Sequence, residues 1–124
     1  MRLLLDTHVV LWWFEGTLGD RVRRTIEEAG SRGFVSPVTV WEVERKRNLG
    51  KLAGEWDVAE RCRDAGFTEL TIGFGHAALA GALPLHHRDP FDRMLVAQAQ
   101  IEGLTVVTSD RQIARYSVAV LPAS

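Results

Sequence analysis

Apolar residues along this chain follow two different spacings. Strands are predicted from short, mostly apolar runs, at residues 2–5, 33–36, 68–72, 104–107 and 118–121. Helices are predicted from segments whose apolar residues recur every three or four positions, at residues 9–15, 19–29, 37–48, 55–65, 76–83, 90–101 and 109–115. Strands that alternate with helices favour an α/β fold with a mostly parallel sheet covered on both faces, and the last strand is expected at an edge.

Helix-start and helix-stop signals bound two of these segments. Either Asp6 or Thr7 can cap the first helix, and Gly16 suits its end. Asp89 followed by Pro90 matches an N-cap and the first helical position, which makes the helix after it the best defined in the chain.

Length, composition and charge limit the classes of protein to which this chain can belong. A length of 124 residues fits one domain, residues 1–124, with 46% hydrophobic and 25% charged residues. The net charge of −1 means that any nucleic-acid contact must come from local basic patches and metal ions. The single Cys62 excludes an internal disulfide and a cysteine-rich zinc site, and it fits a reducing cytosol. The apolar stretch 3–14 contains Asp6 and is too short to span a bilayer, so we expect a cytoplasmic protein with no membrane partner.

Acidic residues recur where predicted strands meet predicted helices. Because the carboxyl ends of parallel strands meet at one edge of a sheet, these acids are expected to gather there. Each acid also has a structural alternative, as a helix cap or a group that favours the positive end of a helix. Asp89 suits the cap, and Asp92, one turn later, suits a ligand. The candidate catalytic acids are Asp6, Glu42, Asp92 and Asp110.

Acids gathered at one edge require a cation. At about 4 Å and an effective dielectric of about 20, each close pair of carboxylates costs on the order of 4 kcal/mol. Mg²⁺ or Mn²⁺ fits an all-oxygen site best, with Asp6, Asp92 and Asp110 as its ligands. Such ions activate water and stabilise the charge that builds on a phosphodiester. His86 and His87 could bind metal, but adjacent side chains point apart, so a loop is predicted for both.

Four segments of the chain stand out by their order and spacing. They are Leu-Leu-Leu-Asp-Thr-His, Ser-Pro-Val-Thr-Val-Trp-Glu, His-Arg-Asp-Pro-Phe-Asp-Arg-Met-Leu-Val-Ala-Gln-Ala and Val-Val-Thr-Ser-Asp. Together, and almost end to end, they resemble the PIN domain, and within it the VapC-type toxins of bacterial toxin–antitoxin modules. The resemblance implies a three-layer α/β/α sandwich, Mg²⁺- or Mn²⁺-dependent cleavage of RNA, and neutralisation by a cognate VapB-type antitoxin.

The resemblance also assigns residues. Its acids fall on the four candidates above, and its hydroxyls, which orient a carboxylate or a metal-bound water, fall on Thr7 and on Thr108 or Ser109. Asp89 is the cap or lies one shell behind the metal. A homodimer or a toxin–antitoxin hetero-oligomer is implied as the assembly. RNA contacts are expected from basic residues near the acids, chiefly Arg45, Lys46, Arg93 and Arg111.

The chain lacks residues that two other classes of protein need, and one non-enzymatic function stays open. A phosphatase of the haloacid dehalogenase type needs a second Asp at position 8, where this chain has His8, and a receiver domain needs a late lysine that is missing. A non-catalytic PIN-like module that binds RNA or protein stays open. Adjacent Trp12 and Trp13 cannot easily face the same core. Core packing is expected for most of the aromatic rings, and a groove for an antitoxin helix or a dimer partner is the alternative for one of these two.

Overall fold

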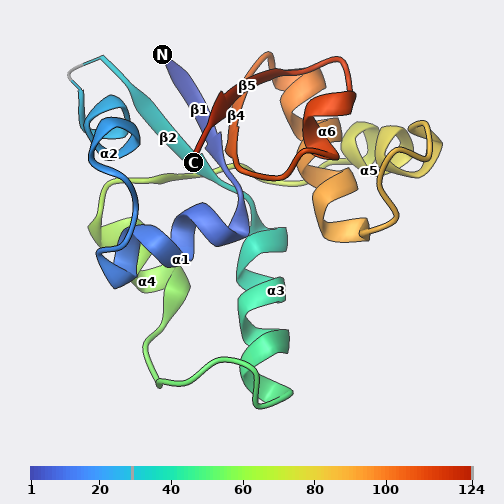
Figure 1. Ribbon diagram of the computed structural model, residues 1–124. Coiled ribbons are helices and arrows are strands. Elements are labelled where there is room, and N and C mark those ends of the chain that lie inside the picture. The colour runs from blue at the N-terminus through green and yellow to red at the C-terminus, as the bar shows by residue number, and fades with distance from the viewer. Residues whose placement is uncertain (29, 124) are drawn as a thin grey trace.

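Five strands form one parallel sheet in the computed structural model, which describes residues 1–28 and 30–123 (Figure 1). The strands are β1 (Arg2–Leu5), β2 (Arg32–Val35), β3 (Thr68–Glu69), β4 (Thr105–Thr108) and β5 (Ala119–Pro122). Their order across the sheet is β3-β2-β1-β4-β5, and each of the four pairings is parallel. The α/β prediction is confirmed, and the sheet is parallel throughout where a mostly parallel one was expected.

The central position of β1 decides where the first acid lies. Leu4 pairs with Phe34 of β2 on one side and with Val106 of β4 on the other. Because all strands run the same way, Asp6 emerges in the middle of the carboxyl edge, between the chain segments that leave β2 and β4.

Helices follow every strand except the last in the described part of the chain. They are α1 (Thr7–Glu15), α2 (Asp20–Glu27), α3 (Pro37–Asn48), α4 (Val58–Asp64), α5 (Phe74–Ala82) and α6 (Pro90–Glu102), with a 3₁₀ turn, η1 (Ile113–Arg115), before β5. Gly16 ends α1 at a φ of 75°, a left-handed conformation that suits glycine. Within the described residues, no helix combines the length and apolar character needed to cross a bilayer.

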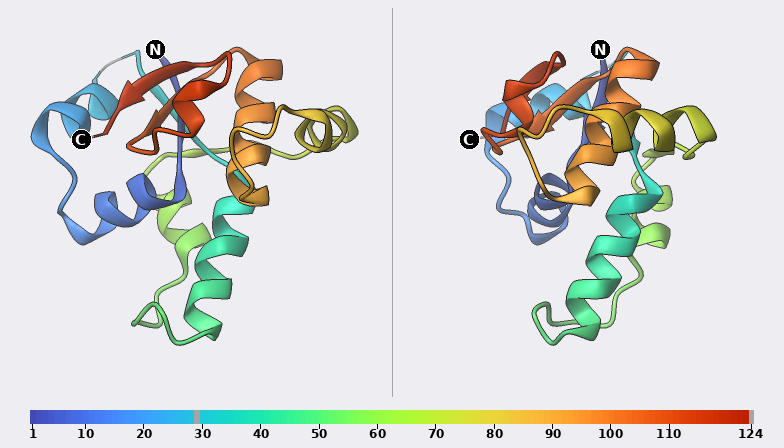
Figure 2. Two further views of the ribbon diagram at one scale, coloured as in Figure 1. Left: turned by 45° about the vertical axis from the view of Figure 1, so that its right-hand side comes forward. Right: turned by 90° about the vertical axis from the view of Figure 1, so that its right-hand side faces the viewer.

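Alternate side chains of β1 pack into two separate hydrophobic cores, one on each face of the sheet. Leu3 and Leu5 pack with residues of α1, α2 and α4. Leu4 packs on the opposite face with residues of α5 and α6. The sheet thus lies between two helical layers, the three-layer sandwich that was expected (Figure 2).

Helix α3 bridges the two layers at the carboxyl edge. Val43 belongs to the first core and Val38, near the start of the helix, to the second. The rest of α3 extends away from the sheet (Figure 1). Its first two turns therefore stand beside the end of β1, with Glu42 among them.

Two predicted elements are shorter than expected. The strand at 68–72 ends at Glu69, because the carbonyls of Leu70 and Thr71 accept from the side chain of Gln98 instead of from a neighbouring strand. The helix at 109–115 shrinks to η1, because Asp110 turns the chain by accepting from the backbone N–H of Gln112.

The remaining differences are shifts of the ends of helices and, by one residue, of strands β2, β4 and β5. Helix α4 begins at Val58, where 55 was expected, because Asp57 caps it through the N–H of Glu60. Helix α5 begins two residues before the predicted 76, with Gly73 at its N-cap. The predicted helix 19–29 corresponds to α2, and its expected end at residue 29 lies outside the described residues.

Candidate metal centre at the carboxyl edge

Asp6 is both a helix cap and a buried acid at the centre of the edge. Its Oδ1 accepts from the N–H of Val9 at 2.9 Å, so the cap of α1 is Asp6 and not Thr7. Its Oδ2 accepts from the hydroxyl of Thr108. Asp6 is only 4% exposed. Burial raises the pKa of its carboxyl, and the hydrogen bonds from Thr108 and Val9 oppose that rise.

Thr108 links the first acid to the last. While its hydroxyl donates to Asp6, its Oγ1 accepts from the backbone N–H of Asp110 at 2.9 Å. This residue ends β4, the strand beside β1. The side chain is 2% exposed, so both hydrogen bonds are shielded from water. The hydroxyl therefore holds Asp6 and Asp110 in a fixed relation.

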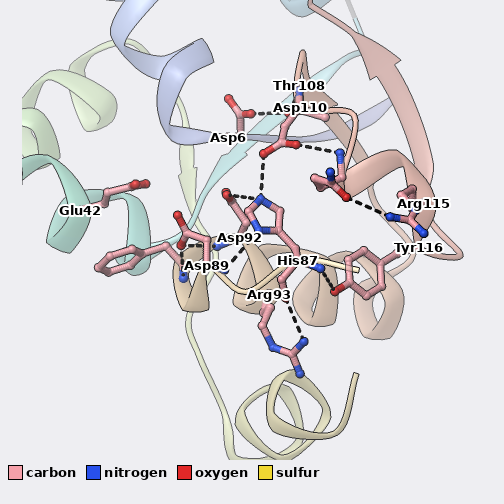
Figure 3. A network of polar contacts seen from close by, with 12 residues as sticks. Asp6, Glu42, His87, Asp89, Asp92, Arg93, Thr108, Asp110, Arg115 and Tyr116 are labelled. Atoms are coloured by element: carbon pink, nitrogen blue, oxygen red, sulfur yellow. Dashed lines mark hydrogen bonds and ion pairs between the residues drawn. The ribbon is translucent and has the colours of Figure 1, made fainter. Parts of the chain in front are cut away.

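Asp89 and Asp92 have different roles at the start of α6. Asp89 is the N-cap, as expected, and its Oδ1 accepts from the N–H groups of Phe91 at 2.8 Å and Asp92 at 3.4 Å. Asp92 lies in the first turn and points toward the end of the sheet (Figure 3). Burial raises the pKa of Asp92 to about 7, and the charges of Asp89, Glu42 and Asp110 add to that rise.

His87 joins Asp92 to Asp110. Its Nε2 lies 3.0 Å from Oδ2 of Asp92 and 2.9 Å from Oδ2 of Asp110 (Figure 3). Its Nδ1 accepts from the backbone N–H of Asp89 at 3.1 Å. Since Nδ1 is an acceptor there, the proton of the neutral ring sits on Nε2 and points at the two carboxylates.

His87 lowers the pKa of Asp110. Burial by itself would raise the pKa of this carboxyl. Hydrogen bonds from His87 and from the N–H of Gln112, together with the charge of His87, lower it below its ordinary value instead. Asp92 and Asp110 thus lie close together with their pKa values moved in opposite directions.

Sequence reasoning missed His87. The segment 86–88 is a loop as expected, but only His86 turns away, and its ring packs against Tyr116 at 5.0 Å between centroids. The opposite orientation of adjacent side chains, which argued against a joint histidine site, is what sends His87 toward the acids. Its place two residues before the cap of α6 was the available signal.

Two side chains fix the loop that carries His87. The hydroxyl of Tyr116 accepts from the N–H of His87 at 2.9 Å and donates to the carbonyl of Pro84 at 2.7 Å. Arg93 donates to the carbonyls of Ala80, Gly81, Leu83, Pro84 and His87. All three guanidinium nitrogens of Arg93 are therefore engaged with backbone, whereas the sequence predicted a contact with RNA.

Glu42 approaches the cluster from the other side. It is 8% exposed, on the first turns of α3, and its Oε2 lies 3.9 Å from Nζ of Lys46. Its carboxylate is directed toward the region of Asp6 and Asp92 (Figure 3). Glu42 joins none of the ligand-distance groupings formed by the described residues, but its charge is felt at Asp92.

Of the other predicted residues, Thr7 is buried and bonded away from the acids, and the rest are exposed. The hydroxyl of Thr7 donates to Thr39 at 3.3 Å and not to an acid, so Thr108 is the hydroxyl that holds a candidate ligand. Ser109, Arg45 and Arg111 are exposed near the acids.

The donor set fits a divalent cation. His87, Asp92 and Asp110 each offer one ligand atom, and these atoms lie within 4.8 Å of one another. Asp6 is tied to this group through Thr108. The raised pKa values of Asp6 and Asp92 show that their negative charge is poorly compensated by protein groups, which a cation would correct. Carboxylate oxygens with one imidazole suit Mn²⁺, and the carboxylates alone suit Mg²⁺.

Solved structures share this fold at low identity. A chain of the DNA-bound VapBC2 complex from Rickettsia felis matches with a TM-score of 0.76 and 12% identity, covering 100% of both chains. DNA-bound VapBC from Salmonella typhimurium gives 0.73 and 17%, covering 100% of this chain and 99% of that one. A toxin–antitoxin complex from Klebsiella pneumoniae gives 0.70 and 19%, covering 98% of each. A search of curated proteins gave no match.

The family model for the PIN domain matches residues 3–119, nearly the whole chain. The matched region includes all four predicted acids, strands β2, β3 and β4, and most of β1. This chain therefore belongs to the PIN domain family.

Proposed function

We propose that this chain is a metal-dependent ribonuclease that acts as the toxin of a toxin–antitoxin pair. The observation that carries the proposal is the convergence of Asp6, Asp92 and Asp110 at the carboxyl edge, two of them with raised pKa values. Such uncompensated charge costs stability unless a cation binds there. The family of the chain is one whose members are typically nucleases.

Asp6, Asp92 and Asp110 would hold Mg²⁺ or Mn²⁺ in this proposal. When bound, the ion supplies Lewis acidity to a phosphodiester and lowers the pKa of a water molecule. Thr108 keeps Asp6 oriented, and His87 keeps Asp92 and Asp110 together. Glu42 has a free carboxylate oxygen aside from its contact with Lys46, and it is the candidate to orient the attacking water.

RNA is the proposed substrate because cationic side chains border the acids. Arg45 and Lys46 follow Glu42 on α3, and Arg111 follows Asp110. Phosphate groups pair with such side chains, and this binding weakens steeply with salt. Arg93 is left out of this set, because its nitrogens already hold the loop of His87.

A cognate antitoxin of the VapB type is the proposed protein partner. The support is that similar folds were solved within toxin–antitoxin complexes. A homodimer or a toxin–antitoxin hetero-oligomer in the cytoplasm is the proposed assembly. Induction of the chain alone in a bacterial host should arrest growth, and induction of the Asp6→Asn variant should not.

Cleavage in vitro tests the activity directly. Purified protein is incubated with RNA and Mn²⁺ or Mg²⁺, with and without EDTA. Asp6→Asn is the matched loss-of-charge variant, since Asn can still accept from the N–H of Val9 and keep the cap. Asp64→Asn, at an exposed position of α4, is the control. Cleavage that EDTA and Asp6→Asn abolish supports the proposal. Cleavage that survives EDTA overturns the proposed metal dependence, and no cleavage with either ion overturns the proposal in favour of a non-catalytic binding module.

A further inference from the structure

Trp41 differs from the other three tryptophans of the chain. Trp12, Trp13 and Trp56 are half-buried and pack against the first core. Trp13, one of the two candidates for a free groove residue, packs edge-on against Phe67 and lies under the guanidinium of Arg23. Trp41 is 64% exposed. Packing against the core therefore accounts for the presence of three of these tryptophans. It does not account for Trp41, whose ring is mostly exposed.

The ring of Trp41 stands at the border of the acid cluster. It precedes Glu42, and successive residues of a helix point about 100° apart, so Glu42 faces the acids while Trp41 faces solvent at their rim. Its ring meets that of Phe91 edge to face, at 4.9 Å between centroids and 81° between planes. Phe91 is buried and directly precedes Asp92. The exposed ring therefore belongs to the residue before one candidate catalytic acid and packs against the residue before another.

Two cationic side chains of α3 lie near the ring. Arg45 follows Trp41 by one turn on the same side of α3 and is exposed. Lys46 follows Glu42 in the same way. A fixed aromatic ring next to cations is the arrangement by which proteins bind unpaired nucleic acid, with a base stacked on the ring and phosphates on the cations.

We propose that Trp41 is a nucleobase-stacking platform beside the site of cleavage, on which one unpaired base of the RNA lies. The proposal rests on the proposed function, since the acids at its side are taken as the catalytic ones. A base inside a duplex has both faces stacked on its neighbours, so only an unpaired base can cover the ring. Stacking of this kind tolerates any base.

Binding measurements test the platform apart from catalysis. A short labelled RNA without self-complementarity and the same RNA in a full duplex are titrated, in EDTA, with wild-type protein, Trp41→Leu, Trp41→Phe and Leu49→Ala. Leu49 is the matched control, because it is an exposed apolar side chain at the C-cap of the same helix, two turns away from Trp41. Trp41→Leu should weaken binding of the unpaired RNA by roughly 5- to 100-fold. Trp41→Phe should restore most of that loss, and Leu49→Ala should leave the affinity unchanged.

Two results overturn the platform. One is unpaired-RNA affinity in Trp41→Leu equal to that of wild type. The other is a change of oligomeric state in Trp41→Leu and Leu49→Ala alike, which would make α3 a contact with a second copy of the chain. Cleavage assays on the same samples separate the two proposals. If the wild type cleaves RNA and Trp41→Leu binds RNA as the wild type does, only the platform is wrong. If the wild type does not cleave RNA but its RNA binding depends on Trp41, only the proposed nuclease activity is wrong.

Discussion

The Nε2 atom of His87 lies 2.9 Å from Oδ2 of Asp110, and the same nitrogen lies 3.0 Å from Oδ2 of Asp92. One N–H is thereby shared between carboxylates from two separate parts of the chain. The loop of His87 is in turn fixed by Arg93 and Tyr116. The geometry of the acid cluster therefore depends on residues that carry no candidate catalytic group.

Replacing His87 should change the pKa of Asp110. With His87→Ala, the hydrogen bond and charge that lower this pKa are lost, and burial alone would act to raise it. We expect the pKa of the Asp110 carboxyl to move to its ordinary value or above. Carboxyl NMR titration of the metal-free protein measures this. His8→Ala, at an exposed position of α1, is the control. An Asp110 pKa that stays low in His87→Ala would contradict the hydrogen-bond assignment.

The stability of the metal-free protein should fall as the pH rises toward neutrality. Asp92 titrates near 3.8 in an unfolded chain and at about 7 when folded, so the folded protein binds more protons between these values. The contribution of Asp92 to the free energy of unfolding is complete below about pH 4 and is lost as the pH rises through about 7. Asp6 acts in the same direction. Thermal unfolding in EDTA across this range, with Asp92→Asn as comparison, measures the effect. A wild-type pH profile identical to that of Asp92→Asn would refute it.

Thr108→Val should impair the site without removing any acid. Valine keeps the shape of threonine but can neither donate to Asp6 nor accept from the N–H of Asp110. Loss of such an orienting group typically costs about 10- to 100-fold in metal affinity or activity. Manganese affinity and RNA cleavage are the measurements. Thr105→Val, at the other end of the same strand, is the control. Equal loss in both variants would mean that the strand, and not the hydroxyl, is responsible.

Arg93→Met should lower stability more than it lowers affinity for RNA. The change leaves five backbone carbonyls without their donor, and we expect a loss of about 2–4 kcal/mol in the free energy of unfolding. Chemical denaturation measures it. Arg45→Met, at an exposed site on α3, should show the reverse pattern, with RNA binding weakened and stability retained. Unchanged stability in Arg93→Met would instead restore this residue as an RNA contact.

The sequence predicted the sheet and the positions of the acids because both are local features. Leu3, Leu4 and Leu5 form an unbroken apolar run that ends at a carboxylate, and Asp89 before Pro90 defines a helix start. These signals lie within a few residues of one another. The alternation of strands and helices predicted a mostly parallel sheet, but it did not predict the order of the strands.

What could not be predicted depends on contacts between distant residues. The strand after Thr68 is short because Gln98, on α6, takes the carbonyls of Leu70 and Thr71. The position of His87 depends on Tyr116, whose hydroxyl binds its backbone from a site 29 residues away. Neither pairing leaves a periodic signal in the sequence. The side chain that joins the acids was thus the one that sequence reasoning assigned to a loop.

Calorimetric titration with Mn²⁺ tests the central claim most directly, because it measures the metal centre without a substrate. Wild-type protein, Asp92→Asn and the exposed control Asp64→Asn are titrated at about pH 8, where the carboxyl of Asp92 is ionised. We predict saturable binding by wild type and Asp64→Asn, and at least about tenfold weaker binding by Asp92→Asn. No binding by wild type, or equal affinity in all three proteins, would contradict the assignment of these acids as a metal centre.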